Sequence, residues 1–195
     1  MAYVPKILAF AGSTRKGSFN KKLVRAAIRG AEAAGAQVTY LDLRDLRLPL
    51  YDGDDEEEGG LPEGAVRLKE MMKAHDGFLI SAPEYNSSIS GALKNAFDWA
   101  SRPAQNEPPL VAFDGKVAAL LSASPGALGG LRGLVTVRSI LGNIKVLVLP
   151  EQLAVSKAHE AFNEDGSMTN PKQQASVEKI GAGLAQFIVK LNAGQ

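Results

Sequence analysis

Apolar residues gather in five short runs along the chain, separated by longer amphipathic or polar stretches. The runs are nearly continuous rather than alternating, and they cover residues 6–11, 38–43, 77–82, 117–123 and 144–149. A strand that is apolar on both faces is typical of a parallel sheet covered by helices on both sides. The pattern therefore predicts five buried parallel strands.

The stretches between these runs carry apolar residues at helical spacing. We expect helices around residues 23–31, 66–72, 93–100 and 131–140, and a closing helix over residues 172–191. Strands that alternate with helices over short connections form doubly wound α/β domains, because right-handed crossovers place helices on both faces of the sheet. A chain of 195 residues suits one such domain, so we predict a single domain over residues 1–195.

Three connections are longer or more polar than simple turns. Residues 52–60 hold six acidic side chains, which we interpret as a solvated, mobile loop rather than a metal site. Residues 100–114 contain three prolines and are expected to lie extended at the surface, as are residues 151–170. His75 and His159 have no partner at metal-ligand spacing, so we predict no metal site and a structural or exposed position for both.

Charge and composition narrow the classes of function. The 22 basic and 21 acidic residues leave a net charge of +1, which gives no reason to expect a nucleic-acid or membrane partner. The sequence has no cysteine, so disulfides and thiol redox chemistry are excluded, and a redox role would need a bound cofactor. The sequence shows neither a membrane-spanning run nor a signal-peptide pattern, from which we expect a cytoplasmic protein.

Residues 12–20, GSTRKGSFN, follow the first predicted strand directly and have the features of a phosphate-binding loop. A helix that begins in such a loop presents free backbone N–H groups and the positive end of its dipole to an anion. The hydroxyls of Ser13, Thr14 and Ser18 and the amide of Asn20 add polar donors, and the guanidinium of Arg15 adds a charged one. The Lys-Ser or Lys-Thr pair of a nucleoside-triphosphate loop is absent, which favours a single phosphate monoester. The alternative is an ordinary polar turn, capped by Ser18 or Asn20, that binds nothing.

A second polar segment, residues 81–91, follows the third predicted strand. In the flavodoxin-type strand order 2-1-3-4-5, the loops after the first and third strands meet where the order reverses, and a mononucleotide binds there. Pro83, Tyr85 and Asn86 suit a flat heteroaromatic ring, because they provide a rigid strand exit, an amphipathic surface and a hydrogen-bonding amide. The alternative is a plain loop in which Tyr85 fills a gap and a serine caps the next helix.

Three spaced motifs occur in this chain: Gly-Ser-x-Arg-x-x-Ser-x-Asn at residues 12–20, Pro-Glu-Tyr-Asn at 83–86 and Leu-Lys-Asn-Ala-Phe-Asp-Trp at 93–99. In this order they resemble the NAD(P)H-dependent FMN reductase family, which includes quinone, chromate and azo-compound reductases. The resemblance spans residues 6–149 and implies a flavodoxin-like FMN-binding domain. It implies phosphate contacts from the first motif, isoalloxazine contacts from the second and further contacts from the loop after the fourth strand. The residues so assigned are Ser13, Arg15, Ser18, Phe19 and Asn20, then Pro83, Glu84, Tyr85, Asn86 and Ser87, and finally Ser124 and Gly126.

The chemistry that this resemblance implies is carried by the cofactor. We expect hydride to pass from NADPH or NADH to FMN, and two electrons to pass on to a quinone, free flavin, chromate or azo acceptor in a ping-pong sequence. The protein then places and tunes the cofactor, and no side chain is expected to act as a catalytic acid, base or nucleophile. Relatives assemble as homodimers or homotetramers through the helix at 93–99, although Trp99 suits a core position equally.

Two other classes of function share some of these features. A flavodoxin-type electron carrier would bind the same cofactor, but such carriers are usually strongly acidic, so the net charge of +1 disfavours that role. A phosphate-binding hydrolase would need a nucleophile that the loop does not supply.

The chain departs from the family pattern at Ser90, where many relatives have proline and where serine can cap the helix. It also departs at Gly133-Leu134, where Ala-Gln often stands, and this bears on the contacts of that helix.

Overall fold

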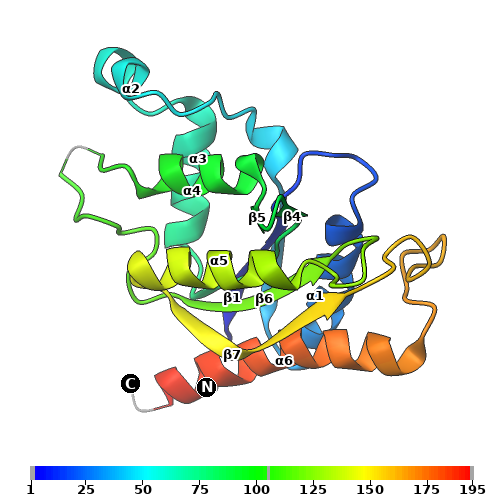
Figure 1. Ribbon diagram of the computed structural model, residues 1–195. Helices are drawn as coiled ribbons and strands as arrows, with labels where there is room; N and C mark the ends of the chain where they lie inside the picture. The colour runs from blue at the N-terminus through cyan, green and yellow to red at the C-terminus, as the bar shows by residue number, and fades with distance from the viewer. Residues whose placement is uncertain (1–2, 105, 194–195) are drawn as a thin grey trace.

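The computed structural model describes residues 3–104 and 106–193 of the chain. Its centre is a five-stranded parallel sheet in the order β2-β1-β3-β6-β7 (Figure 1). The strands are β1 (Lys6–Ala11), β2 (Gln37–Asp42), β3 (Gly77–Ser81), β6 (Val117–Ala123) and β7 (Leu147–Val155). Because β6 and β7 are the fourth and fifth strands of this sheet along the chain, the predicted order and the flavodoxin-like α/β fold are confirmed.

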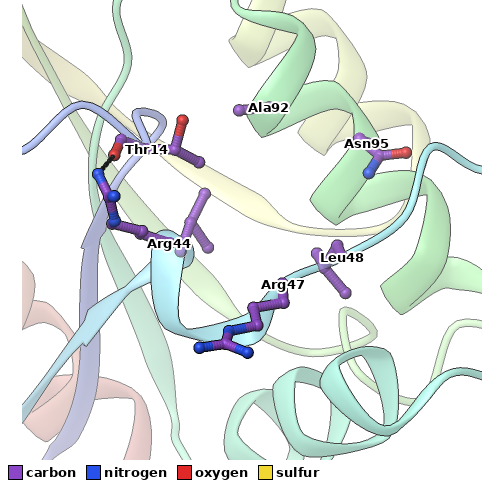
Figure 2. A pocket seen from close by; sticks show the side chains of 7 residues that line it. Thr14, Arg44, Arg47, Leu48, Ala92 and Asn95 are labelled. Atoms are coloured by element: carbon purple, nitrogen blue, oxygen red, sulfur yellow. Dashed lines mark hydrogen bonds between the residues drawn. The ribbon is translucent and has the colours of Figure 1, made fainter.

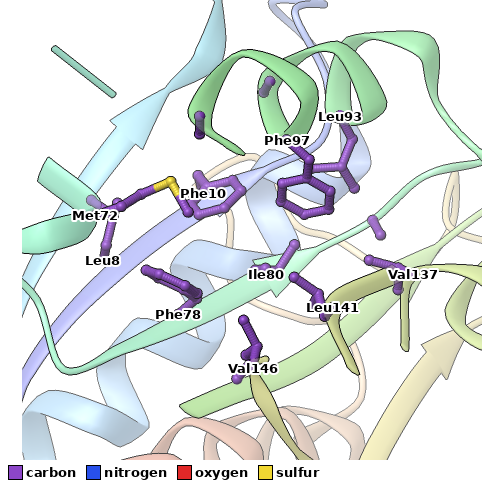
Figure 3. Packing of buried hydrophobic residues seen from close by; sticks show 14 of the residues in the cluster. Leu8, Phe10, Met72, Phe78, Ile80, Leu93, Phe97, Val137, Leu141 and Val146 are labelled. Atoms are coloured by element: carbon purple, nitrogen blue, oxygen red, sulfur yellow. The ribbon is translucent and has the colours of Figure 1, made fainter. Parts of the chain in front are cut away.

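Helices cover both faces of the sheet and divide the core into two apolar layers. One layer contains α1 (Phe19–Ala33) and α6 (Pro171–Asn192), and the other contains α3 (Glu63–Lys73), α4 (Gly91–Ser101) and α5 (Leu131–Asn143). In the second layer, Phe10 and Phe78 of the sheet pack among side chains from all three helices (Figure 3). The continuous apolar runs in the sequence are explained by this burial from both sides.

Helices α1 and α6 approach each other closely through glycines. A β-carbon added to Gly30 would collide with the carbonyl oxygen of Glu178, and one added to Gly181 would collide with the carbonyl oxygen of Ala27. Each helix therefore presents a glycine to the backbone of the other, and larger residues would push them apart. This contact holds α1, whose first turn follows the predicted phosphate-binding loop.

Trp99 of α4 lies inside the chain. Its side chain is 1% exposed, its indole N–H donates to the carbonyl oxygen of Pro49 at 2.9 Å, and its ring meets Tyr51 edge to face. Asn95 of the same helix holds this segment too, because its amide accepts from the N–H of Tyr51 and donates to Pro49. Of the two positions that the sequence left open for Trp99, it takes the core position.

The acidic segment at residues 52–60, expected to be a mobile loop, contains the short helix α2 (Gly53–Gly59). Asp52 caps this helix by accepting a hydrogen bond from the N–H of Asp54 at 2.9 Å, and the acidic first turn complements the positive end of the helix dipole. Glu56 accepts a hydrogen bond from Arg102 at 2.8 Å, which ties α2 to the end of α4. Two of the acidic side chains that suggested a mobile loop therefore stabilise α2: Asp52 caps it and Glu56 binds it to Arg102.

Strand β7 extends to Val155, beyond the end predicted at residue 149. The register of its pairing with β6 shifts between Ala118 and Leu120, where the strands are irregular. Pro150 lies in the corresponding part of β7, and a proline cannot donate a ladder hydrogen bond, so a bulge there is expected. The connection predicted over residues 151–170 therefore begins only after β7 ends.

The connection after α4 is anchored rather than extended along the surface. Glu107 pairs with Lys69 and Lys73, each at 2.6 Å, and hydrogen bonds from these two lysines lower the pKa of its carboxyl to about 2. Phe113 is fully buried and packs edge to face against two core phenylalanines. The expectation of an extended surface segment was wrong for this residue, because proline content does not reveal a buried aromatic anchor.

Both histidines occupy the kinds of position expected. The Nδ1 atom of His75 lies 2.6 Å from the carbonyl oxygen of Met71, and its Nε2 atom lies 2.8 Å from the hydroxyl of Thr39, so its role is structural. His159 is exposed beside Glu160. Within residues 3–104 and 106–193, no three histidine, cysteine or acidic side chains are grouped as metal ligands. In that same part of the chain, no helix combines the length and apolar character needed to cross a membrane.

Candidate functional site

The carboxyl ends of β1, β3 and β6 lie side by side at one edge of the sheet, and the loops that follow them line a small cavity of about 120 Å³. The lining residues come from all three loops and are Ser13, Arg15, Ser18, Phe19, Asn20, Pro83, Glu84, Tyr85, Ala123, Ser124 and Pro125. The structure therefore brings the two predicted motifs and the loop after the fourth strand to one place. The other predicted residues, Asn86, Ser87 and Gly126, lie outside this lining.

The loop between β1 and α1 presents a helix N-terminus to the cavity. Ser18 precedes α1 in extended backbone, and within the described residues its hydroxyl makes no capping hydrogen bond. The side chain of Arg15 is exposed, while its backbone N–H donates to the hydroxyl of Ser13 at 3.3 Å. An uncommitted hydroxyl, an exposed guanidinium and the positive end of a helix together suit a phosphate monoester.

Gly12 lies where the first two loops touch. A β-carbon at this position would lie 2.9 Å from two side-chain atoms of Leu93 and 3.1 Å from the ring of Pro83. The N–H of Gly12 donates to the carbonyl oxygen of Ser81 at 2.9 Å, and its carbonyl accepts a short hydrogen bond from the hydroxyl of Ser90. Ser90 also accepts from the N–H of Leu93 at 3.2 Å, so this serine caps α4 as expected.

The side chain of Asn20 is committed to the protein scaffold. Its Nδ2 atom donates to the carbonyl oxygen of Ala123 at 2.9 Å, and its Oδ1 atom accepts from the N–H of Ala123 at 3.0 Å and from the hydroxyl of Ser81 at 2.8 Å. Asn20 therefore ties the first turn of α1 to β3 and β6. A contact with a phosphate stays a prediction for this residue, and only the second N–H of the amide is left to make it.

The predicted ring-binding segment contains a small hairpin, β4 (Glu84–Tyr85) and β5 (Ser88–Ile89). Asn86 and Ser87 form its two-residue turn with φ angles of 51° and 66°, the left-handed backbone that tight hairpins require. Tyr85 is 59% exposed and does not fill a gap in the core. Its ring is available to stack on a planar ligand or on a substrate that approaches the cavity.

Glu84 connects this hairpin to α5. Its carboxylate accepts hydrogen bonds from the backbone N–H groups of Arg132 and Gly133 at 3.0 and 3.2 Å, and from the Nε atom of Arg132 at 2.8 Å. Burial raises the pKa of this carboxyl, but the hydrogen bonds from Arg132 and Gly133 outweigh burial, so the pKa lies below its ordinary value. Since α5 begins after Gly130, which has no side chain, Glu84 acts as its N-terminal cap from another part of the chain.

Gly133 explains one departure from the family pattern. A β-carbon at this position would lie 3.2 Å from the side chain of Glu84 and 3.2 Å from the carbonyl oxygen of Ser88. Helix α5 thus packs tightly on the hairpin, and glycine makes this approach possible.

The loop after β6 forms the third wall. The N–H of Ser124 donates to the carbonyl oxygen of Val155 at 3.0 Å, and its hydroxyl accepts from the N–H of Gly126 at 3.3 Å. Gly126 therefore supports Ser124 from outside the cavity. Gly130, with φ of 92°, allows the chain to pass the hydroxyl of Ser122 closely before α5 begins.

Sequence reasoning missed three contributors to this site. Ala123 and Pro125 line the cavity on either side of Ser124, and Arg132 holds Glu84. The resemblance to the family already pointed to the loop after the fourth strand, which contains Ala123 and Pro125, but it assigned contacts only to Ser124 and Gly126. Arg132 carries no such signal, because its contact depends on two segments that are 48 residues apart.

Most of the chain matches one known protein family. Residues 5–160 match the family described as NADPH-dependent FMN reductase. The chain belongs to this family. Membership confirms the predicted resemblance, and with it an enzyme of the oxidoreductase class that works with FMN and NAD(P)H.

Individual relatives agree with this assignment. An NAD(P)H-dependent FMN reductase of Pseudomonas aeruginosa is 35% identical to the chain, covering 95% of this chain and 96% of its own length. A probable NADPH:quinone oxidoreductase of Oryza sativa subsp. japonica is 33% identical and covers 95% and 90%. Among solved structures, a flavoenzyme NAD(P)H:(acceptor) oxidoreductase from Paracoccus denitrificans superimposes with a TM-score of 0.79 at 31% identity, covering 96% of this chain and 98% of that one.

The residues present fit FMN. The unbonded hydroxyl of Ser18, the exposed guanidinium of Arg15 and the N-terminus of α1 provide donors for its phosphate. Pro83 and Tyr85 on one side and Ser124 on the other provide walls for its ring system. Both ends of a mononucleotide therefore have suitable surfaces around the same cavity.

Proposed function

We propose that this chain is a quinone reductase that takes reducing equivalents from NADPH or NADH and passes them through bound FMN to a quinone. One observation carries the proposal, namely that the phosphate-type loop at α1 and the exposed aromatic hairpin at Tyr85 line a single cavity. The first feature suits retention of the cofactor, and the second suits an open face at which donor and acceptor can approach. The names of the relatives support the same activity.

The side chains of this site bind and orient rather than react. We assign the cofactor phosphate to Ser13, Arg15 and Ser18, because their donors gather at the start of α1. FMN held by these residues would supply hydride and electron-transfer chemistry, by which NAD(P)H, one proton and a quinone would become NAD(P)⁺ and a hydroquinone. Asn20 and Glu84 keep the loop and the hairpin in place through bonds to neighbouring backbone.

We assign no acid or base to the reaction. Glu84 is the acidic residue on the cavity lining, and its carboxylate is engaged by Arg132 and Gly133 with a lowered pKa, which suits a cap rather than a proton donor. The exposed ring of Tyr85 beside the cavity supports the use of one open face by donor and acceptor in turn. We therefore propose ping-pong kinetics, with chromate, azo compounds and free flavin as further acceptors.

Initial rates test this proposal directly. Rates measured at several fixed quinone concentrations, with NADPH varied, should give parallel double-reciprocal lines. Chromate, an azo dye and free FMN should each replace the quinone in the same assay. Intersecting lines would reject the ping-pong sequence. The proposed activity would be rejected if none of these acceptors supported NAD(P)H oxidation.

A flavodoxin-type electron carrier is the competing function on this fold. The balanced charge of the chain, with a net value of +1, does not suit docking on a basic partner protein. NADPH oxidation with quinone in the absence of any second protein separates the two roles, because a carrier needs its reductase. We further propose that the enzyme acts in the cytoplasm, where NAD(P)H is produced. We also propose that it forms a homodimer or a homotetramer, and sedimentation velocity would distinguish these two states.

A further inference from the structure

A second cavity lies on the other side of the phosphate loop, with a volume of about 510 Å³. Three segments line it (Figure 2): the loop itself, the short helix η1 (Leu43–Leu46) with the residues after it, and the start of α4. The lining residues are Thr14, Leu43, Arg44, Arg47, Leu48, Ala92 and Asn95. This volume is within the usual range for small-molecule sites, and of these residues only Thr14 belongs to the loop of the site described above.

Two arginines border this cavity, and in Figure 2 the side chain of Arg44 extends toward Thr14 whereas that of Arg47 extends away from it. Arg44 and Arg47 are both exposed, and in the described part of the chain neither forms an ion pair with an acidic side chain. The nearby carboxylate of Asp42 is paired with Lys21 at 2.6 Å. Asp45, between the two arginines in sequence, lines a neighbouring cavity that Arg47 also borders, and it forms no ion pair with Arg47 within the described residues. The two guanidinium groups therefore retain their capacity to bind an anion such as a phosphate.

The rest of the cavity suits a flat ring attached to that anion. Leu43, Leu48 and Ala92 provide apolar surface, and a guanidinium plane can stack on a purine. Asn95 adds a rigid wall, because both ends of its amide are bonded to residues 49 and 51. Ala92 lies in the first turn of α4, so the positive end of this helix also faces the region.

Thr14 joins this cavity to the FMN site. It lies between Ser13 and Arg15, which line the smaller cavity, and its carbonyl oxygen accepts a long hydrogen bond of 3.4 Å from Arg44. A ligand that occupies both cavities must have two parts, a ring that reaches the flavin and a phosphate-bearing end. The reduced nicotinamide dinucleotides have this form, and NADPH differs from NADH by one phosphate on the adenosine ribose.

We propose that the cavity between η1 and α4 binds the adenosine end of NADPH, and that Arg44 and Arg47 hold its 2′-phosphate. This inference rests on the proposed function, since it concerns the electron donor of that reaction. It makes the enzyme selective for NADPH over NADH, because only NADPH carries the phosphate that two unpaired guanidinium groups would recognise.

Kinetics of the FMN-loaded enzyme provide the first test. The variants are Arg44→Ala, Arg47→Ala and the double variant, and the control is Arg29→Ala, an exposed arginine of α1 outside both linings. In the double variant the ratio of kcat/KM for NADPH to kcat/KM for NADH should fall by about tenfold or more, since two charge-assisted contacts are lost. The flavin absorbance of each variant shows whether the phosphate loop still retains FMN. A ratio that stays at the wild-type value would overturn the proposal.

A binding measurement tests the cavity without turnover. Isothermal titration of the FMN-loaded protein with adenosine 2′,5′-bisphosphate should show affinity about tenfold higher than with adenosine 5′-monophosphate. The double variant should lose this preference, and the Arg29→Ala control should keep it. Equal affinity for both nucleotides in the wild type, or a preference that survives the double substitution, would refute the assignment. If the wild type oxidised neither coenzyme, the proposed function would fail, whereas the titration would still decide the cavity.

Discussion

The carboxylate of Glu84 accepts hydrogen bonds from the backbone and the side chain of Arg132, at 3.0 and 2.8 Å, and so joins the aromatic hairpin to the N-terminus of α5. Glu84→Ala should lower the free energy of unfolding by about 1–2 kcal/mol, because the first turn of α5 loses its cap. Urea unfolding of the apoprotein measures this change. Arg132→Met is the matched control and should cost less, because Arg132 is 58% exposed and its backbone N–H remains bonded. An equal cost for both variants would show that the ion pair, and not the cap, stabilises α5.

Arg15 is predicted to hold the phosphate of FMN. Arg15→Ala should weaken FMN binding by about 2 kcal/mol, the scale of a lost hydrogen bond to a charged group. Fluorescence titration of the apoprotein with FMN measures the affinity, and riboflavin, which lacks the phosphate, is the control ligand. The variant should bind riboflavin as the wild type does. An equal loss for both ligands would place Arg15 at the ring rather than at the phosphate.

Tyr85 and Asn86 are predicted to act on turnover rather than on cofactor retention. Tyr85→Ala should raise the KM for quinone about tenfold with little change in FMN content, because the exposed ring can stack on an incoming acceptor. Asn86 has φ of 51°, so Asn86→Gly removes the side chain without straining the turn, whereas alanine would strain it. Stopped-flow reduction by NADPH, followed by oxidation with quinone, measures the two half-reactions separately. Wild-type rates for both variants in both half-reactions would move the active face away from the hairpin.

The crossing of α1 and α6 offers a matched pair of glycines on one helix. Gly181→Ala should destabilise the fold by about 2 kcal/mol or more, because the new methyl group would collide with the carbonyl oxygen of Ala27. Gly183→Ala has open space around the added methyl group and should stabilise by up to about 1 kcal/mol through helix propensity. Thermal or urea unfolding compares them. A similar effect for the two substitutions would mean that the helices can separate without cost.

Glu107 should make stability depend on pH. Its folded pKa of about 2 lies below the ordinary value of 4.5, so its contribution to stability is fully present above pH 4.5 and is lost as pH falls through about 2. The difference in unfolding free energy between the wild type and Glu107→Gln should therefore be constant near neutral pH and shrink below pH 4.5. Glu70→Gln is a control, because Glu70 pairs with Lys73 alone and is 60% exposed. A difference that stayed constant down to pH 2 would contradict the coupling to Lys69 and Lys73.

The five strands, and the loop at residues 12–20 between a strand and a helix, could be predicted because both depend on local sequence, whereas phosphate binding at this loop stays a prediction. Continuous apolar runs indicate burial from two sides, and the polar residues that follow such a run indicate a loop at the start of a helix. Helix α2 does not follow from the sequence pattern, because a run of carboxylates is equally typical of a solvated loop, and the cap at Asp52 is the one local sign of a helix. The hairpin at residues 84–89 was missed because two-residue strands are too short to show a period.

Long-range contacts account for the rest. The residue types at Glu84 and Asn20 were consistent with ligand contacts, but the structure commits the carboxylate of Glu84 to Arg132 and Gly133 and the amide of Asn20 to Ser81 and Ala123. The partners of Glu84 lie 48 and 49 residues away along the chain, and Ala123 lies 103 residues from Asn20. No local pattern encodes such pairs, because they form only when the sheet and helices have assembled.

The position of Asn20 affects how the phosphate-binding loop at residues 12–20 can change during evolution. Its amide is hydrogen-bonded to Ser81 and Ala123 and so fixes the start of α1. The conformation of the loop is therefore determined by contacts within the protein and does not depend on a bound ligand. The exposed side chains of Thr14, Arg15 and Lys16 can then be exchanged with little loss of folding free energy. Substitutions at these positions can therefore change which anion the loop binds without unfolding the protein. Ligand specificity can then evolve while the fold is kept.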